Sequence, residues 1–125
     1  MMRYVWVALG GALGSIARYV LGVAVYQRFG TVFPYGTFAI NISGCFLIGL
    51  VATFLETRTG MPAAWRYTVP IGFIGAYTTF STFEYEAFAS AQAGQPGIAF
   101  LNIALSVVVG YLAVWLGVLA AKVVA

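Results

Sequence analysis

Charged residues are scarce in this 125-residue chain, which has six Lys or Arg, three Asp or Glu, and no histidine. They make up 7% of the sequence, whereas an ordinary soluble domain is about 25% charged. Hydrophobic residues make up 62%, and the mean hydropathy is +0.97. A soluble domain of this size cannot bury so much apolar surface. The composition therefore predicts an integral membrane protein surrounded by a lipid bilayer.

Cysteine is almost as rare, since Cys45 is the only one. A single cysteine excludes an intrachain disulfide, and without histidine a transition-metal site has almost no ligands. The net charge of +3 is of a kind often seen in nucleic-acid-binding proteins. Here the basic residues flank hydrophobic segments, so we interpret them as topology signals and predict no nucleic-acid partner.

Long uncharged runs cover residues 29–55, 67–83 and 87–121, and a shorter run covers 4–17. Because a membrane-spanning helix needs about 20 apolar residues, we predict an all-α protein with four transmembrane helices. The first stretch is longer than the apolar part of a signal peptide and contains Arg18, so we expect it to be retained. The chain 1–125 is predicted to form one four-span domain, with spans near 4–26, 37–55, 66–90 and 98–122.

The basic residues are unevenly distributed between the two ends of the predicted bundle. An even number of spans places both termini and the 56–65 loop on one side. That side carries four basic residues and the other side carries Arg28 alone; the four are Arg3, Arg58, Arg66 and Lys122. This bias favours termini in the cytoplasm, in the inner (plasma) membrane.

Small and polar residues recur at four-residue steps in three of the spans. The stripes are Gly10, Gly14 and Arg18; Thr37, Asn41 and Cys45; and Asn102, Ser106 and Gly110. Such stripes ordinarily let helices pack closely. Three of them on four helices indicate more packing than one protomer uses, which predicts an oligomer, most simply a dimer.

Two polar residues within the spans have alternative interpretations. Arg18 either faces a water-filled cavity or extends its head to the membrane surface. Asn41 lies near the middle of its span, where its amide must find partners. It either joins two helices or presents an N–H donor to an anion.

Residues 72–86, "GFIGAYTTFSTFEYE", interrupt the apolar pattern. Gly72 and Gly75 precede two threonines, which predicts a break in the third helix at 75–78. The freed carbonyls would suit a bound cation, or the break is a packing kink stabilised by Ser and Thr. Phe80 and Phe83 share a face among hydroxyls. Their ring edges are electropositive and suit an anion, although aromatic residues at this spacing are ordinarily core packing.

Three motifs in this order carry a resemblance to a known family: "GGALGSIARY" (10–19), "GTFAINISG" (36–44) and "GFIGAYTTFSTF" (72–83). They resemble the Fluc (CrcB-type) family of bacterial fluoride channels, over the whole chain. The resemblance implies an antiparallel, dual-topology dimer with two pores for passive fluoride efflux. Some members work as oppositely oriented paired proteins, so the second copy is either this chain or a homologue. We favour the homodimer.

The resemblance also implies roles for individual residues. The rings of Phe80 and Phe83 line the pore, and Asn41 donates to fluoride. The carbonyls of Gly75 and Thr78 hold a structural sodium ion at the dimer centre. Further pathway positions implied by the resemblance are Ser81, Thr82, Glu86 near the end of the path, and Arg18 near a vestibule. We also assign the polar track of the fourth span, Asn102 and Ser106, to this path.

The chain departs from the family pattern at Ala76, Glu84 and Tyr111. A carboxylate at Glu84 would either repel fluoride or lie in the vestibule. The main alternative function is a small four-span multidrug exporter, which needs an embedded carboxylate that the first span lacks. The other alternative, a structural subunit, leaves the spacing of Phe80 and Phe83 without a purpose. Nothing in the sequence indicates an enzyme or ATP use, because there is no phosphate-binding loop.

Overall fold

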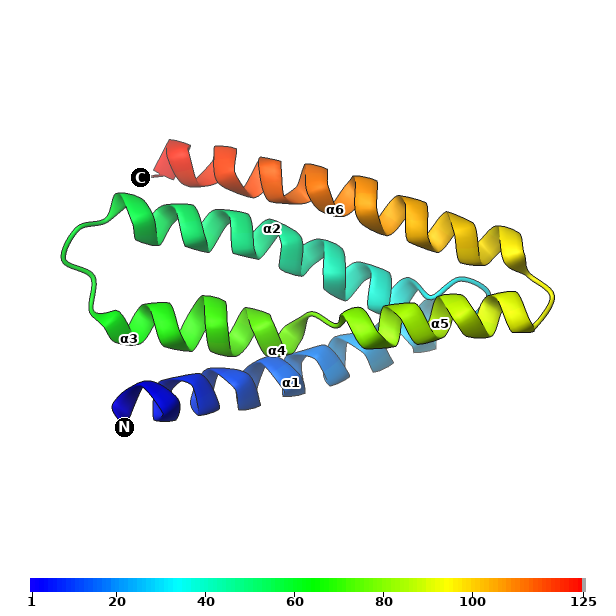
Figure 1. The fold of residues 1–125 in the computed structure, drawn as a ribbon, viewed down its shortest axis with the longest axis horizontal. Coiled ribbons are helices and arrows are strands. Elements are labelled where there is room, and N and C mark those ends of the chain that lie inside the picture. The colour runs from blue at the N-terminus through cyan, green and yellow to red at the C-terminus, as the bar shows by residue number, and fades with distance from the viewer. Residues whose placement is uncertain (125) are drawn as a thin grey trace.

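The computed structural model describes residues 1–124, which form four roughly antiparallel helical rods (Figure 1). Three rods are single helices: α1 (Met2–Phe29), α2 (Tyr35–Thr57) and α6 (Pro96–Val124). Among the described residues, these three are long and apolar enough to cross a membrane. Even α2, with 23 residues, extends about 35 Å at 1.5 Å per residue, which exceeds a hydrocarbon core of about 30 Å. The all-α prediction is confirmed.

The third rod is assembled from four consecutive pieces. These are α3 (Ala63–Arg66), the π-helical stretch η1 (Tyr67–Ile74), α4 (Gly75–Tyr77) and α5 (Phe80–Gln92). Pro70 lies inside η1. Proline has no N–H to donate and its ring clashes with the preceding turn, which accounts for the wider helix there.

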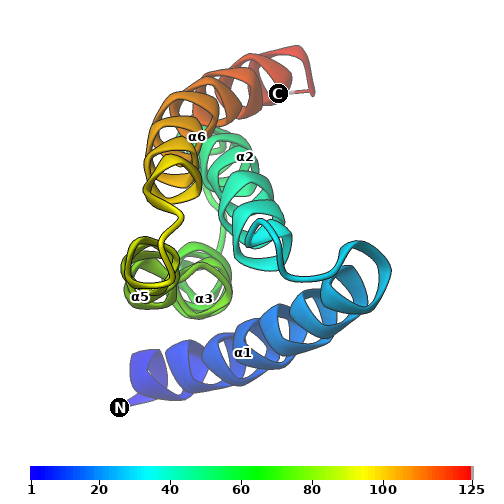
Figure 2. The same cartoon turned by 90° about the vertical axis from the view of Figure 1, so that its right-hand side faces the viewer.

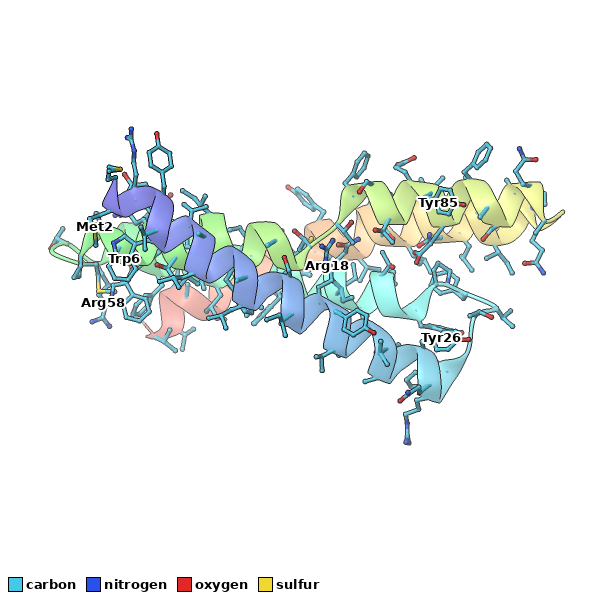
Figure 3. The ribbon with its side chains drawn as sticks, turned by 90° about the horizontal axis from the view of Figure 1, so that it is seen from below. Met2, Trp6, Arg18, Tyr26, Arg58 and Tyr85 are labelled. Atoms are coloured by element: carbon cyan, nitrogen blue, oxygen red, sulfur yellow. The ribbon has the colours of Figure 1, made fainter. Side chains whose placement is uncertain are left out.

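Both termini and the 58–62 loop lie at one end of the bundle, whereas the other two turns lie at the opposite end (Figure 1). The end-on view shows α2 next to α6, and α1 on the opposite side of the third rod (Figure 2). Figure 3 shows Arg58 and Met2 at the same end of the bundle, the end that carries the termini. The basic residues therefore divide between the two ends as the sequence predicts.

Glycine residues at the contacts between rods let the helix backbones touch each other. A Cβ atom added to Gly10 or Gly14 of α1 would overlap the backbone of Thr68 or Phe73. On α6, a Cβ added to Gly117 would overlap the backbone of Phe46 in α2. Gly10, Gly14 and Gly117 are thus used in contacts inside one protomer. These contacts do not themselves require a second copy, and the dimer stays a prediction.

The interruption of the third rod lies at Thr78–Thr79, not over 75–78. Gly75 has ordinary helical angles (φ −60°, ψ −36°). Thr78 (φ −79°, ψ 156°) and Thr79 (φ −148°, ψ 112°) are extended. The helix therefore continues through the glycines and ends only where the β-branched pair begins.

Candidate functional site

The break is held by Asn41 of α2, which bonds both backbone groups of Thr79. Asn41 Oδ1 accepts from the Thr79 N–H at 2.8 Å, and Asn41 Nδ2 donates to the Thr79 carbonyl at 3.0 Å. Of the two interpretations of Asn41, the helix-joining one is therefore observed. The amide nitrogen carries a second hydrogen, which these two bonds leave free for a further acceptor.

Thr79 also caps the helix that follows the break. Its Oγ1 accepts from the Thr82 N–H at 3.3 Å and lies 3.0 Å from Thr82 Oγ1. A threonine that bonds the third residue of a helix satisfies one of the first unpaired N–H groups. The positive end of α5 is thereby fixed in the middle of the rod.

The carbonyl end of α4 faces the opposite way across the same break. In a continuous α-helix the Gly75 carbonyl would accept from the Thr79 N–H, but that group donates to Asn41. The Thr78 N–H and Oγ1 both donate to the Ile74 carbonyl, at 3.1 and 3.0 Å. Carbonyl oxygens freed in this way are suitable ligands for a hard cation such as sodium. No cluster of His, Cys, Asp or Glu that would hold a metal ion occurs within residues 1–124.

Two further residues of α2 contact the carbonyl side of the break. The Ser43 and Tyr77 hydroxyls lie 2.7 Å apart, and Ser43 Oγ donates to the Ile40 carbonyl at 3.0 Å. A Cβ added to Gly44 would overlap Thr78 Cγ2. Residues 41–44 of α2 therefore contact every residue from Tyr77 to Thr79.

A groove of about 420 Å³ opens beside the break, between α2, the third rod and α6. It brings together residues of two of the three motifs that carry the family resemblance, 36–44 and 72–83, with Ser106 of α6. The predicted site residues that line it are Asn41, Gly75, Thr78, Phe80, Phe83 and Ser106.

The two phenylalanines contact each other at the mouth of this groove. Their ring centroids are 5.9 Å apart and the rings are inclined at 51°. Phe83 is buried, with 6% of its surface exposed, whereas Phe80 is 74% exposed. Only Phe83 is therefore core packing within one protomer, and Phe80 projects from it.

Glu86 lies one turn beyond Phe83 and accepts from Thr37 Oγ1 at 2.8 Å. Both residues line a second hollow of about 400 Å³, which extends to the loop between α1 and α2. Glu86 Oε2 is buried without a hydrogen-bond partner in the described chain. Sequence reasoning placed Thr37 only in a packing stripe, and the signal it passed over was a hydroxyl within an apolar span.

Asn102 of α6 is also buried, with 2% of its surface exposed. Its Oδ1 accepts from Ser106 Oγ at 3.2 Å, and its Nδ2 has no partner among the described residues. Phe83 and Ser106 face the first groove across the α5–α6 hairpin. Glu86 is one turn after Phe83 on α5, and Asn102 is one turn before Ser106 on α6. Because the two helices are antiparallel, Glu86 and Asn102 lie at the same level of the hairpin.

The remaining predicted residues lie outside the groove. Ser81 and Thr82 are exposed on α5. Arg18 is half-buried on α1, and Figure 3 shows it at the level where α4 gives way to α5. Glu84 is exposed on α5, and Tyr111 is 77% exposed on α6.

Comparison with known proteins gives a consistent result. Residues 5–118 match the family described as CrcB-like protein, Camphor Resistance (CrcB). A protein of Acidobacterium capsulatum named fluoride-specific ion channel FluC is 62% identical over 116 residues, which cover 93% of each chain. Proteins with the same name in Solibacter usitatus (48% identical, 97% of this chain and 99% of the relative) and Geobacter sp. strain M21 (47%, 98% of each) are also similar.

Proposed function

This chain belongs to the CrcB-like family, whose relatives are named fluoride-specific ion channels and not enzymes, and we propose that it exports fluoride passively from the cytoplasm. One observation of the structure supports the proposal above others. A helix begins in the middle of the third rod, capped by Thr79, beside a groove lined by Asn41 and two phenylalanines. The N-terminus of such a half-helix attracts an anion.

The donors around the groove suit a small, strongly hydrated anion. The free hydrogen of Asn41 Nδ2, the hydroxyl of Ser106 and the ring edges of Phe80 and Phe83 replace water without presenting a full positive charge. Weak donors in series let an ion bind and leave, which conduction requires.

The other predicted residues extend this path in both directions. Ser81 and Thr82 offer hydroxyls on the exposed face of α5, and Arg18 raises the local anion concentration near the vestibule. Glu86 marks the far end, where its contact with Thr37 borders the second hollow.

A structural sodium ion belongs to the same proposal. Gly75 and Thr78 line the groove, and the Gly75 carbonyl has lost its α-helical donor to Asn41. Carbonyls from two copies of α4, brought together across a two-fold axis, would coordinate one sodium ion at the dimer centre.

The exposed face of α5 supports a dimer. Phe80, Ser81, Thr82 and Glu84 are all exposed on this helix, which belongs to the predicted third span. Polar and charged groups that face lipid are unfavourable, so a partner must cover them. We propose a second, antiparallel copy of the chain in the inner membrane, or an oppositely oriented homologue, which completes two pores with this one.

Fluoride release from liposomes tests the proposed function. Purified protein is reconstituted in vesicles loaded with potassium fluoride, and external fluoride is followed with an electrode after addition of a potassium ionophore. We expect rapid release that needs no ATP or proton gradient, and no release of chloride from matched vesicles. Absence of fluoride release, or equal release of chloride, would contradict the proposal.

A further inference from the structure

Within residues 1–124, the Ser43–Tyr77 contact is the only side-chain hydrogen bond between α2 and α4. The two bonds from Asn41 are made to Thr79, on the other side of the Tyr77–Thr78 junction. Tyr77 is 6% exposed, and its ring stacks on Phe73 of η1 at 5.9 Å with planes 12° apart. The last turn before the break therefore has one polar link to the rest of the bundle.

The direction of the hydrogen bond follows from counting hydrogens. The Ser43 hydroxyl has one hydrogen, which it donates to the Ile40 carbonyl. The contact with Tyr77 therefore uses the phenol as donor and Ser43 as acceptor. The result is a chain of two bonds from Tyr77, through Ser43, to the backbone of α2.

This link acts on the last turn before the break. The α4 segment is three residues long and follows the π-helical η1, and the Thr78 N–H just after it still bonds the Ile74 carbonyl. Its end determines where the Gly75 and Thr78 carbonyls point. A shift of Tyr77 would move both carbonyls, whereas Asn41 would still hold Thr79.

We propose that Ser43 and Tyr77 are positioning residues, which fix the carbonyl end of the broken helix and thereby the cation site at the dimer centre. This inference rests on the proposed function, because the cation site belongs to that proposal. The two residues do not contact the ion. They act through the backbone of the last turn of α4.

The two single variants are expected to differ. In Tyr77→Phe the phenol is absent and Ser43 keeps its bond to Ile40, so no donor is left unpaired. In Ser43→Ala the phenol remains in a buried setting without an acceptor, which is the more costly loss. The double variant Ser43→Ala/Tyr77→Phe has no unpaired donor. Its defect should therefore equal that of Tyr77→Phe and be smaller than that of Ser43→Ala.

The first measurement is the sodium dependence of fluoride release, with N-methylglucamine as the replacement cation. One lost hydrogen bond corresponds to a shift of about three- to tenfold. We expect Tyr77→Phe to raise the half-activating sodium concentration by about that factor, and Ser43→Ala by more. The matched control is Tyr85→Phe, which removes a hydroxyl from an exposed tyrosine of α5 and should leave the sodium dependence unchanged.

The second measurement is amide hydrogen exchange, which does not depend on transport. Both single variants should speed exchange at residues 78–80 and leave the middle of α6 unchanged. A lower melting temperature with unaltered sodium dependence and unaltered exchange at 78–80 would show ordinary core packing and overturn the proposal. Wild-type vesicles that release no fluoride would contradict the proposed function instead, and exchange at the break would then decide the role of the pair.

Discussion

Asn41 accepts one hydrogen bond from the backbone of Thr79 and donates one to it. In a soluble protein water would satisfy the same two groups at little cost. At membrane depth no water replaces them, so the amide is part of the scaffold before it is part of a binding site. Its remaining N–H is then held in a fixed direction. A donor that does not reorganise when an ion arrives binds that ion at a lower entropic cost.

The two phenylalanines differ at this scale, and substitution should separate their roles. Phe80→Ile should lower fluoride release about tenfold, because the loss of one ring interaction of up to about 1.5 kcal/mol has that effect on a rate. The melting temperature should stay unchanged, since Phe80 is 74% exposed in the protomer. Phe83→Ile should lower both fluoride release and the melting temperature, because Phe83 is buried.

Phe88→Ile provides the matched control for this prediction. Phe88 is 61% exposed and lies two turns beyond Phe80 on α5, outside the groove. Fluoride release should be normal in this variant. If Phe80→Ile and Phe88→Ile behave alike, the ring of Phe80 has no special part in conduction.

At the scale of elements, the third rod places two opposite helix ends beside each other. The C-terminus of α4 presents carbonyls and the N-terminus of α5 presents N–H groups, separated by Thr78 and Thr79. The two ends carry opposite partial charges. One interruption thus places a partly negative and a partly positive helix end side by side, and α2 contacts this region through residues 41–44.

The approach of α2 to this break depends on Gly44, and Gly44→Ala should show it. The added methyl would overlap Thr78 Cγ2, so we expect a destabilisation of about 1–3 kcal/mol. Thermal unfolding in detergent, followed by tryptophan fluorescence, should register the loss as a lower melting temperature. Thr78→Ser removes the overlapping methyl and keeps the hydroxyl, so it should partly rescue Gly44→Ala.

Gly97→Ala is the control for the glycine prediction. Nothing lies within 4 Å of a Cβ added there, near the start of α6. Its melting temperature should equal that of the wild type. If Thr78→Ser changes the melting temperature by the same amount in Gly44→Ala and in the wild type, the overlap is not the cause of the destabilisation.

At the scale of the whole molecule, the charges and the exposed faces make different demands. Four basic residues lie at the end that carries the termini and one lies at the other. This bias favours a single orientation in the membrane. The exposed polar face of α5, in contrast, favours a partner, which we have proposed to have the opposite orientation. A paired homologue of opposite orientation would meet both demands, whereas one chain inserted both ways would meet only the second.

Labelling from each side of intact cells distinguishes these assemblies. Cys45→Ser removes the native thiol, and Met2→Cys introduces one at the end of α1 that carries the termini. For a dual-topology homodimer we expect an impermeant maleimide to label about half of the protein in intact cells and the rest after permeabilisation. Labelling from one side alone would contradict the homodimer and would require an oppositely oriented partner chain.

The sequence predicted the spans because their signal is additive over many residues. Uncharged runs give the existence of each rod, and the glycine–threonine stretch gives the presence of a break. The position of the break was harder to predict, since a glycine at position 75 allows a helix to end there but does not require it. The capping pattern of Thr79 and Thr82 marks the restart more directly, because a threonine followed three residues later by a second hydroxyl fits an N-cap.

Contacts between distant segments were beyond prediction from the sequence alone. Ser43 and Tyr77 are 34 positions apart, and Thr37 and Glu86 are 49 apart. Each pair depends on the rotation and register of two packed helices, which small changes at glycine contacts determine. The residue types at these positions are compatible with many pairings, and only the packed bundle selects one.

The order of Asn41 and Thr79 along the chain has a consequence for biosynthesis. A ribosome completes α2 before it reaches the interrupted rod, so the amide that bonds Thr79 is already made when that residue emerges. The break therefore need not enter lipid with its backbone groups bare. Permuting the chain so that the third rod is synthesised first would remove this protection, even though the finished protein would contain the same contacts.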